Sequence, residues 1–324
     1  MKKIKNYIAF IIIIISIYLL FTIKLPYYIE GPGDLININD RYKIEDEYKS
    51  KGSINMTFVS EYDATIPLYL YAKINKDYDI LKKDVVLPGN ESQKDSDFRG
   101  KIMLKEANDT AIIKAYEKAG KEYNILSQKI VVTYIGENAN TDLKIGDEII
   151  SVDGIKITSR EELKKIITSH NIGDRLNIEV KNNNKNYNKY GIVDKEKKVG
   201  FMFSYDRVIE TKPKIEIKYK KDEFGPSGGL MTTLVIYNKL TEEDITHGKV
   251  ISGTGTIEED GSIGEIDGVK YKLRGAVKRK ADIFFVPVGN YKEAKKLKDK
   301  YNYKIKLVKV KTFDDALKYL KKEV

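Results

Sequence analysis

The sequence predicts an α+β protein that begins with one transmembrane helix. Three kinds of pattern lead to this class. An uncharged apolar run fills residues 6–23. Runs that alternate between apolar and polar residues, such as 54–59 and 175–180, indicate strands, and apolar residues at helical spacing occupy 102–119. With 324 residues, 41% of them hydrophobic and 33% charged, the chain can build more than one globular domain.

Residues 1–24 are predicted to be a membrane anchor. The apolar run 6–23 is long enough to cross the bilayer core as a helix. Lysines before it favour a cytoplasmic N-terminus, so the chain after about residue 25 is expected outside the cytoplasm, with Tyr27 and Tyr28 at the membrane interface. A cleaved signal peptide is the alternative. The segment 24–28 lacks the small residues of a cleavage site, which favours the uncleaved anchor in the cell membrane.

Composition argues against several classes of partner and cofactor. The net charge is +10, but the lysines are scattered and no aromatic-interleaved basic stripe occurs, so nucleic acid is not an expected partner. The chain has no cysteine, and its two histidines, His170 and His247, are single and are interpreted as polar surface residues and not as metal ligands. No metal and no other cofactor is therefore expected.

The first part of the soluble region, 25–124, is expected to alternate between turns, strands and one helix. Gly31-Pro32-Gly33 indicates a turn, and the charged, Gly- and Asn-containing segment 83–97 indicates a loop. The apolar periodicity over 102–119 predicts a helix that ends at Gly120. The segment 130–135 is predicted to be a strand.

A distinctive block follows in the middle of the chain. Residues 143–154 read L-x-x-G-D-x-I-x-x-V-x-G, and Ser159 with Glu162 fits the capping box of an amphipathic helix. This pattern resembles the PDZ domain, over about 125–204. A Φ-G-Φ sequence of the kind that binds carboxylates, Val199–Phe203, is interpreted as lying after the domain. The resemblance implies binding of extended polypeptides at a sheet edge; a spacer without ligand is the alternative.

The last part, 205–324, holds the candidate catalytic residues. Ser227 stands in Gly-Pro-Ser-Gly-Gly at the start of an apolar helical run, where free N–H groups and the helix dipole favour an oxyanion, with the amides of Ser227 and Gly228 as donors. Downstream, Lys270 shares a predicted helix face with Leu273 and Val277, and Lys272 is interpreted as solvated. A lysine on an apolar face loses its hydration, which favours the neutral amine that accepts a proton.

Together these segments resemble the Lon-type proteolytic domain, a Ser/Lys peptidase. The matching strings are 225–229, Thr254-Gly255-Thr256-Ile257 and the run 261–270. The resemblance implies that Ser227 is the nucleophile, that Lys270 is the general base and that the Thr254 hydroxyl lies near this lysine. Residues 52–72 and 102–120 resemble the first half of such a domain, so the PDZ-like block is expected as an insertion. Lon-type domains commonly form hexameric rings, which makes a homo-oligomer possible.

The sequence therefore predicts a membrane-anchored serine endopeptidase that acts on unfolded or tail-exposed polypeptides. No G-x-x-x-x-G-K-[ST] motif occurs, so proteolysis is not expected to consume ATP. One alternative is a catalytically inactive PDZ scaffold or chaperone-like protein that binds partners at the membrane. Another is a protein that cleaves only itself during maturation.

Overall fold

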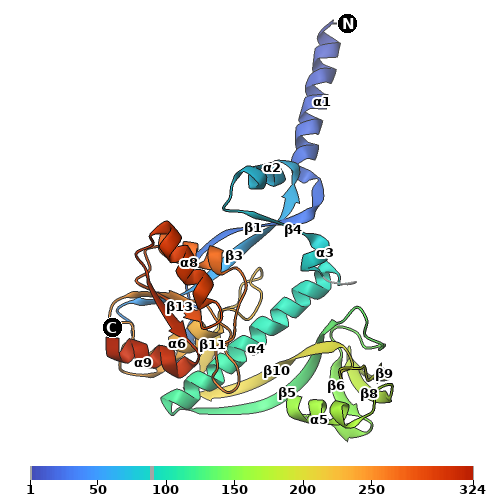
Figure 1. Cartoon of the computed structure of the whole chain (residues 1–324), viewed down its shortest axis with the longest axis vertical. Helices are drawn as coiled ribbons and strands as arrows, with labels where there is room; N and C mark the ends of the chain where they lie inside the picture. Colours follow the sequence, from blue (N-terminus) through green and yellow to red (C-terminus); the bar gives the residue numbers. More distant parts are fainter. Residues whose placement is uncertain (1, 88–90, 324) are drawn as a thin grey trace.

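The computed structural model describes residues 2–87 and 91–323 and has a mixed α+β fold with one N-terminal apolar helix. Helix α1 (Lys2–Thr22) extends away from the rest of the molecule, and the PDZ-like block of the middle of the chain, called the PDZ unit below, lies at the opposite end (Figure 1). Within α1, the segment Ile4–Thr22 is fully exposed and is long and apolar enough to cross a membrane. A signal sequence near the N-terminus has the same properties, so α1 has the character of a membrane span or a signal peptide.

The main sheet combines strands from both ends of the chain. Its six strands lie in the order β14-β13-β12-β3-β1-β4. Their bounds are β1 (Lys24–Asn37), β3 (Ser53–Thr65), β4 (Asp79–Lys82), β12 (Val250–Gly253), β13 (Ile283–Pro287) and β14 (Lys306–Val310). Strand β3 joins the halves, because it is antiparallel to β1 and parallel to β12. The Asn55 side chain reinforces this junction by donating to the Ile251 carbonyl at 3.0 Å.

Helices cover both faces of this sheet. They are α2 (Ile66–Ile74), α3 (Lys83–Val86), α4 (Gln93–Ala119), α6 (Gly229–Leu240), α7 (Val269–Lys278), α8 (Tyr291–Tyr301) and α9 (Phe313–Glu323). Neighbouring strand residues point to opposite faces. Phe285 accordingly joins the core that α4, α6 and α9 share, whereas Phe284 packs in the core of α7 and α8. Helix α6 is buried along its whole length, which fixes the position of the loop before it.

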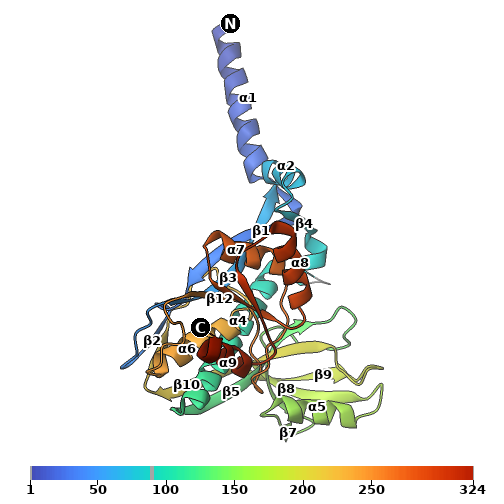
Figure 2. The same ribbon diagram turned by 60° about the vertical axis from the view of Figure 1, so that its left-hand side comes forward.

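The middle of the chain forms a second sheet with its own core, in the order β10-β5-β6-β8-β9, with β7 paired to β6 (Figure 2). Its elements are β5 (Glu122–Ile135), β6 (Glu148–Val152), β7 (Ile155–Lys156), α5 (Arg160–Ser169), β8 (Arg175–Asn182), β9 (Lys185–Ile192) and β10 (Phe201–Lys212). The predicted capping box is confirmed, because the Glu162 N–H donates to Ser159 Oγ at 3.1 Å and the Glu162 carboxylate accepts from the Ser159 N–H at 3.2 Å. A separate two-stranded sheet pairs β2 (Tyr42–Ile44) with β11 (Ile215–Ile217).

Two predictions for the segment that follows α1 are wrong. The Gly31-Pro32-Gly33 segment does not turn; it continues along β1, and the register against β3 shifts between Pro32 and Leu35. Tyr28 is not at a membrane interface. It is 5% exposed, because β3 and β4 flank β1 at this point, and the Lys83 ammonium group lies 4.8 Å from the centre of its ring.

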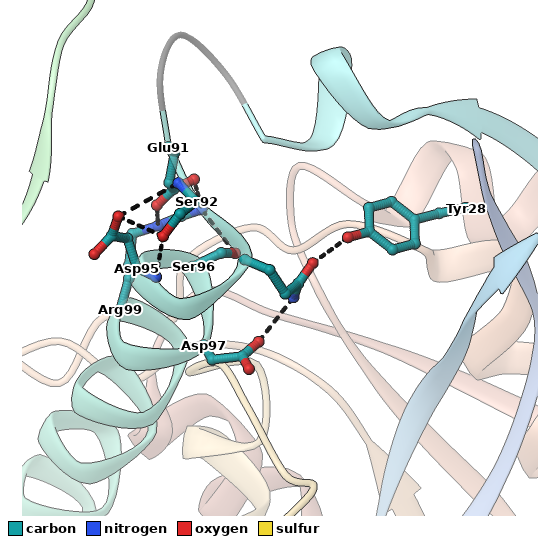
Figure 3. Close-up of polar contacts among 8 residues, drawn as sticks. Tyr28, Glu91, Ser92, Asp95, Ser96, Asp97 and Arg99 are labelled. Carbon is teal, nitrogen blue, oxygen red and sulfur yellow. Dashed lines mark hydrogen bonds and ion pairs between the residues drawn. The ribbon is translucent and has the colours of Figure 1, made fainter. Parts of the chain in front are cut away.

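The predicted loop 83–97 is largely helical: α3 occupies its start and α4 begins at Gln93, while residues 88–90 lie outside the described residues. Polar contacts explain the early start of α4 (Figure 3). Ser92 and Asp95 form a capping box, and Arg99 binds the Glu91 carboxylate with two hydrogen bonds of 2.8 Å. The Tyr28 hydroxyl donates to the Gln93 side chain, which ties this helix to β1. Gly120 ends α4 in the left-handed conformation, as predicted.

Candidate functional site

The loop around Ser227 leads directly into the buried helix α6. Gly225 has φ +84°, a conformation that favours glycine, and Gly228 is the N-cap residue of the helix. Ser227 is partly exposed and lines a cavity of about 630 Å³. Among the described residues, none accepts a hydrogen bond from the N–H of Ser227 or Gly228. The loop therefore presents a hydroxyl and two free donors beside a helix N-terminus, where negative charge is stabilised.

The segment after β12 holds the backbone of Ser227 in place. The Thr254 hydroxyl donates to the Ser227 carbonyl at 3.0 Å, and the Gly255 N–H donates to the same oxygen at 2.9 Å. The Leu230 N–H in turn donates to the Gly255 carbonyl at 3.1 Å. Thr254 is fully buried, so this clamp is shielded from water. The predicted residues Ser227, Gly228 and Thr254 are thus brought together.

The sequence-based placement of Lys270 is wrong. Its side chain does not face the core; it is 28% exposed and forms an ion pair of 2.9 Å with Asp79 on β4. The ammonium group also lies 4.7 Å from the centre of the Tyr271 ring. Lys270 is not among the residues that line the cavity at Ser227. The structure therefore separates Lys270 from the other candidate residues.

Lys272, interpreted from the sequence as solvated, is the lysine that the structure buries at this site. It is 4% exposed and lines the same cavity as Ser227. Its ammonium group lies 3.4 Å from the Thr254 hydroxyl, which in turn binds the Ser227 carbonyl. Burial lowers the pKa of Lys272 to about 8, and the carboxylates of Asp267 and Glu30 oppose part of this effect. A substantial share of this lysine is therefore neutral near physiological pH.

Helical spacing is equally compatible with Lys272 on the buried face. It lies three residues after Val269 and four before Ala276, and both are buried. The predicted stripe of Lys270, Leu273 and Val277 is a neighbouring face of the same helix. The helix begins after Gly268, which is the N-cap residue and has φ +72°.

Apolar residues and carboxylates line the rest of the cavity. Met56, Phe58, Leu104 and Phe224 contribute apolar surface, whereas Glu30, Glu61 and Asp222 contribute carboxylates. Burial raises the pKa of Glu30, and the neighbouring carboxylates of Asp79 and Asp267 raise it further. The cavity can therefore hold a segment of extended polypeptide beside the Ser227 hydroxyl and the Lys272 amine.

A second groove lies in the PDZ unit, between α5 and the edge strand β10. Its volume is about 420 Å³. Leu163 and Ile167 of α5 and Phe201 and Phe203 of β10 give it an apolar floor. Lys164, Lys197 and Lys198 lie at its rim, where Glu196 pairs with Lys198 at 2.9 Å. An edge strand beside an apolar groove with a positive rim suits an extended peptide that ends in a carboxylate.

The Φ-G-Φ sequence lies inside the PDZ unit, not after it. Val199 and Gly200 line the groove, and Phe201 begins β10, which pairs with β5. Gly200 has φ +82°, and a side chain at this position would come within 2.8 Å of Ala139 Cβ. The position therefore requires glycine, and the backbone turns sharply at the end of the groove.

Neither histidine belongs to a metal-type cluster within the described residues. His170 ends α5, and its Nδ1 lies 2.9 Å from the Ile166 carbonyl. His247 lies in a turn with φ +49°.

Comparisons with known proteins identify the middle unit. A family model for the PDZ domain matches residues 119–188. Among solved structures, the PDZ domain of the SdrC-like protein from Listeria monocytogenes is 23% identical; the match covers 25% of this chain and 92% of that one, with a TM-score of 0.22. The second domain of the Listeria protein Lin2157 is 24% identical over 26% of this chain and 88% of that one, with a TM-score of 0.21. No curated protein matches the chain. The chain contains a PDZ domain, as the sequence predicted.

Proposed function

We propose that this protein is a membrane-anchored serine endopeptidase of the Lon type, in which Ser227 is the nucleophile and Lys272 the general base. One observation carries the proposal. Among the described residues, Lys272 is the single buried lysine that lines the Ser227 cavity, and burial lowers its pKa to about 8. A lysine becomes a useful base when burial lowers its pKa towards neutrality. The strings 225–229 and 254–257 resemble the Lon-type domain, and they are joined by the hydrogen bonds that Thr254 and Gly255 donate to the Ser227 carbonyl.

The proposed reaction proceeds through an acyl-enzyme. Neutral Lys272 accepts the proton of the Ser227 hydroxyl as the oxygen attacks the peptide carbonyl carbon. The N–H groups of Ser227 and Gly228 stabilise the oxyanion. The C–N bond then breaks, and protonated Lys272 returns the proton to the leaving amine. Water repeats the attack on the ester, with Lys272 again as base, which releases the acid and restores Ser227.

Thr254 is proposed to position both groups. Its hydroxyl donates to the Ser227 carbonyl, and it is the polar group nearest to the Lys272 ammonium among the hydrogen bonds of the described residues. Because Thr254 is fully buried, it can hold the lysine without admitting water.

The PDZ domain is proposed to recruit polypeptide substrates, and α1 to anchor the protein with its N-terminus in the cytoplasm. The apolar groove with its lysine rim supports the first statement, because PDZ domains bind peptides. Three lysines in the first five residues support the second. Cleavage is proposed to require no ATP.

The experiment that tests this function uses the full chain in detergent micelles, with unfolded casein as substrate and no nucleotide. The intact protein is expected to degrade casein, and Ser227→Ala is expected to bind it without degradation. If intact protein and Ser227→Ala degrade casein equally, the enzyme proposal fails. Tail binding without any cleavage would support the inactive scaffold, and processing of this chain alone would support self-cleaving maturation.

Gly228→Ala is expected to lower kcat/KM at least about tenfold, because the new methyl group would lie 2.1 Å from Met56 Sδ. The collision displaces either the donor N–H or the cavity wall beside Ser227. Rates of peptide cleavage measure the effect. The double variant Gly228→Ala/Met56→Ala is the control and is expected to recover most of the rate. A double variant as slow as Gly228→Ala would contradict the steric cause.

Ile167→Glu is expected to weaken binding of an apolar-tailed peptide by at least about tenfold, because it places a carboxylate in the groove beside the peptide carboxylate. Fluorescence anisotropy with a labelled peptide measures the affinity. Ile172→Glu is the matched control, since Ile172 is 61% exposed and does not line the groove. Equal affinities for the two variants would show that the tail binds elsewhere.

A further inference from the structure

A third cavity separates the PDZ groove from the Ser227 loop. Its volume is about 510 Å³. Most of its walls come from α4 (Glu106 and Ala107), β10 (Phe203 and Ser204) and the loop 256–262. Pro226, the residue immediately before Ser227, also lines it. The cavity therefore lies between the PDZ domain and the proposed catalytic loop.

This cavity borders the PDZ groove. Arg160, Met202 and Phe203 line both spaces. Arg160 stands at the junction: its guanidinium lies 3.0 Å from Glu106 on α4 and 5.1 Å from the centre of the Phe203 ring. One side chain therefore links the wall of the groove to the wall of the cavity.

The order of residues along β10 determines the direction in which a bound C-terminal peptide would run. Val199, Gly200 and Phe201 line only the groove, Met202 and Phe203 line both spaces, and Ser204 lines only the cavity. A carboxylate held at the turn of Gly200 places the last residue of the peptide there. The preceding residues then run antiparallel to β10, past Phe203, into the cavity.

The charge of the cavity also suits a particular segment. Four carboxylates line it: Glu106, Glu258, Glu259 and Asp260. Arg160 is the one basic side chain among the described residues that line it. Glu106 already pairs with Arg160, and Glu259 with Arg207, so Glu258 and Asp260 are the carboxylates that basic residues upstream of an apolar C-terminus would complement.

We propose that this cavity holds the segment that precedes the PDZ-bound tail, so that cleavage takes place at a fixed number of residues from the substrate's C-terminus. The inference rests on the proposed peptidase function and names its substrate class: polypeptides with a free apolar C-terminus and basic residues just upstream. The PDZ domain then sets the position of the cut, and not only the affinity.

The test uses the full chain in detergent micelles and unstructured peptides of about 25 residues, each ending in four apolar residues. One, two or three Gly or Ser residues are inserted immediately before these four, and mass spectrometry identifies the products. The length of the C-terminal product is expected to stay constant, so that the cut moves with the terminus. A C-terminal amide is expected to lower kcat/KM by about tenfold or more.

A cut that stays at the same sequence in every peptide would overturn this inference and leave the proposed peptidase intact. Equal cleavage of peptides that end in a carboxylate and of peptides that end in an amide would also overturn the inference and leave the proposed peptidase intact. Failure to cleave any peptide, together with failure to degrade casein, would instead remove the proposed function on which the inference rests.

Variants of the protein provide a second readout. Arg160→Ala removes the link between the groove and α4, so it is expected to turn one cut site into several neighbouring sites. Arg175→Ala is the matched control: Arg175 lies over the Tyr190 ring at 4.1 Å within the PDZ domain and lines neither space. Thermal melting checks that both variants fold. A single unchanged cut site in folded Arg160→Ala would contradict the proposed path.

Discussion

Lys272→Ala is expected to lower kcat/KM for peptide cleavage by about 10³-fold, because it removes the proposed proton acceptor for Ser227. Lys270→Ala is expected to keep the rate within about threefold, since its ammonium binds Asp79 on the surface and does not line the cavity. Steady-state rates with a fluorogenic peptide measure both variants. The two lysines lie two positions apart on one helix, which makes this a sharp comparison.

The comparison between the two lysine variants is valid only if both variants fold. Lys270→Ala removes a partly exposed ion pair, whose contribution to the free energy of unfolding is about 1 kcal/mol or less. Lys272→Ala removes a buried charge and leaves space beside Thr254, so thermal melting is recorded for both. The reverse result, an inactive Lys270→Ala and an active Lys272→Ala, would indicate that Lys270 is the general base, as the sequence pattern predicted.

The rate of cleavage is expected to rise with pH. With a pKa of about 8, about 1% of Lys272 is neutral at pH 6 and about 90% at pH 9. Only the neutral amine accepts the Ser227 proton, so kcat/KM should increase about 100-fold over this range and then level off. A pH–rate profile with the full chain measures this. A profile that is flat between pH 6 and 9, or that falls above pH 7, would contradict the assignment.

The same pKa makes Lys272 a cost to stability. Its pKa falls from 10.5 to about 8 on folding, so below pH 8 the folded protein holds a buried charge that the unfolded chain keeps hydrated. This lowers the free energy of unfolding by up to about 3 kcal/mol, and the loss disappears as pH rises from 8 to 10.5. Lys272→Met is therefore expected to be inactive but more stable at pH 7, as measured by urea unfolding. The free energy of unfolding of Lys272→Met should exceed that of the intact protein by more at pH 7 than at pH 10. A smaller excess at pH 7 than at pH 10 would contradict this.

Local patterns predicted much of the candidate site. The Gly-Pro-Ser-Gly-Gly string gave the loop before α6, because glycine and an apolar run mark a helix start. Local patterns could not show whether Lys270 or Lys272 lies on the buried face of the helix. Leu273 is compatible with a stripe through Lys270 and Val277 and with one through Val269 and Lys272. Only the contacts of α7 with β1 and β3 decide which face is buried, and these strands lie more than 200 residues earlier in the chain.

Long-range pairing explains the other differences. Gly31-Pro32-Gly33 has the composition of a turn, but its pairing with β3 keeps it in a strand. Val199–Phe203 follows the predicted strands of the PDZ block, and only the pairing of β10 with β5 brings it to the groove. The PDZ domain itself was predictable because its turns and capping box depend on neighbouring residues.

Acylation of Ser227 tests the central claim most directly. The full chain is mixed with a peptide p-nitrophenyl ester at pH 8.5, quenched in acid and digested for mass spectrometry. The proposed mechanism predicts a burst of nitrophenol and one acyl group on the peptide that contains Ser227, with neither in Lys272→Met. An unmodified Ser227 in protein whose PDZ domain still binds apolar-tailed peptides would contradict it.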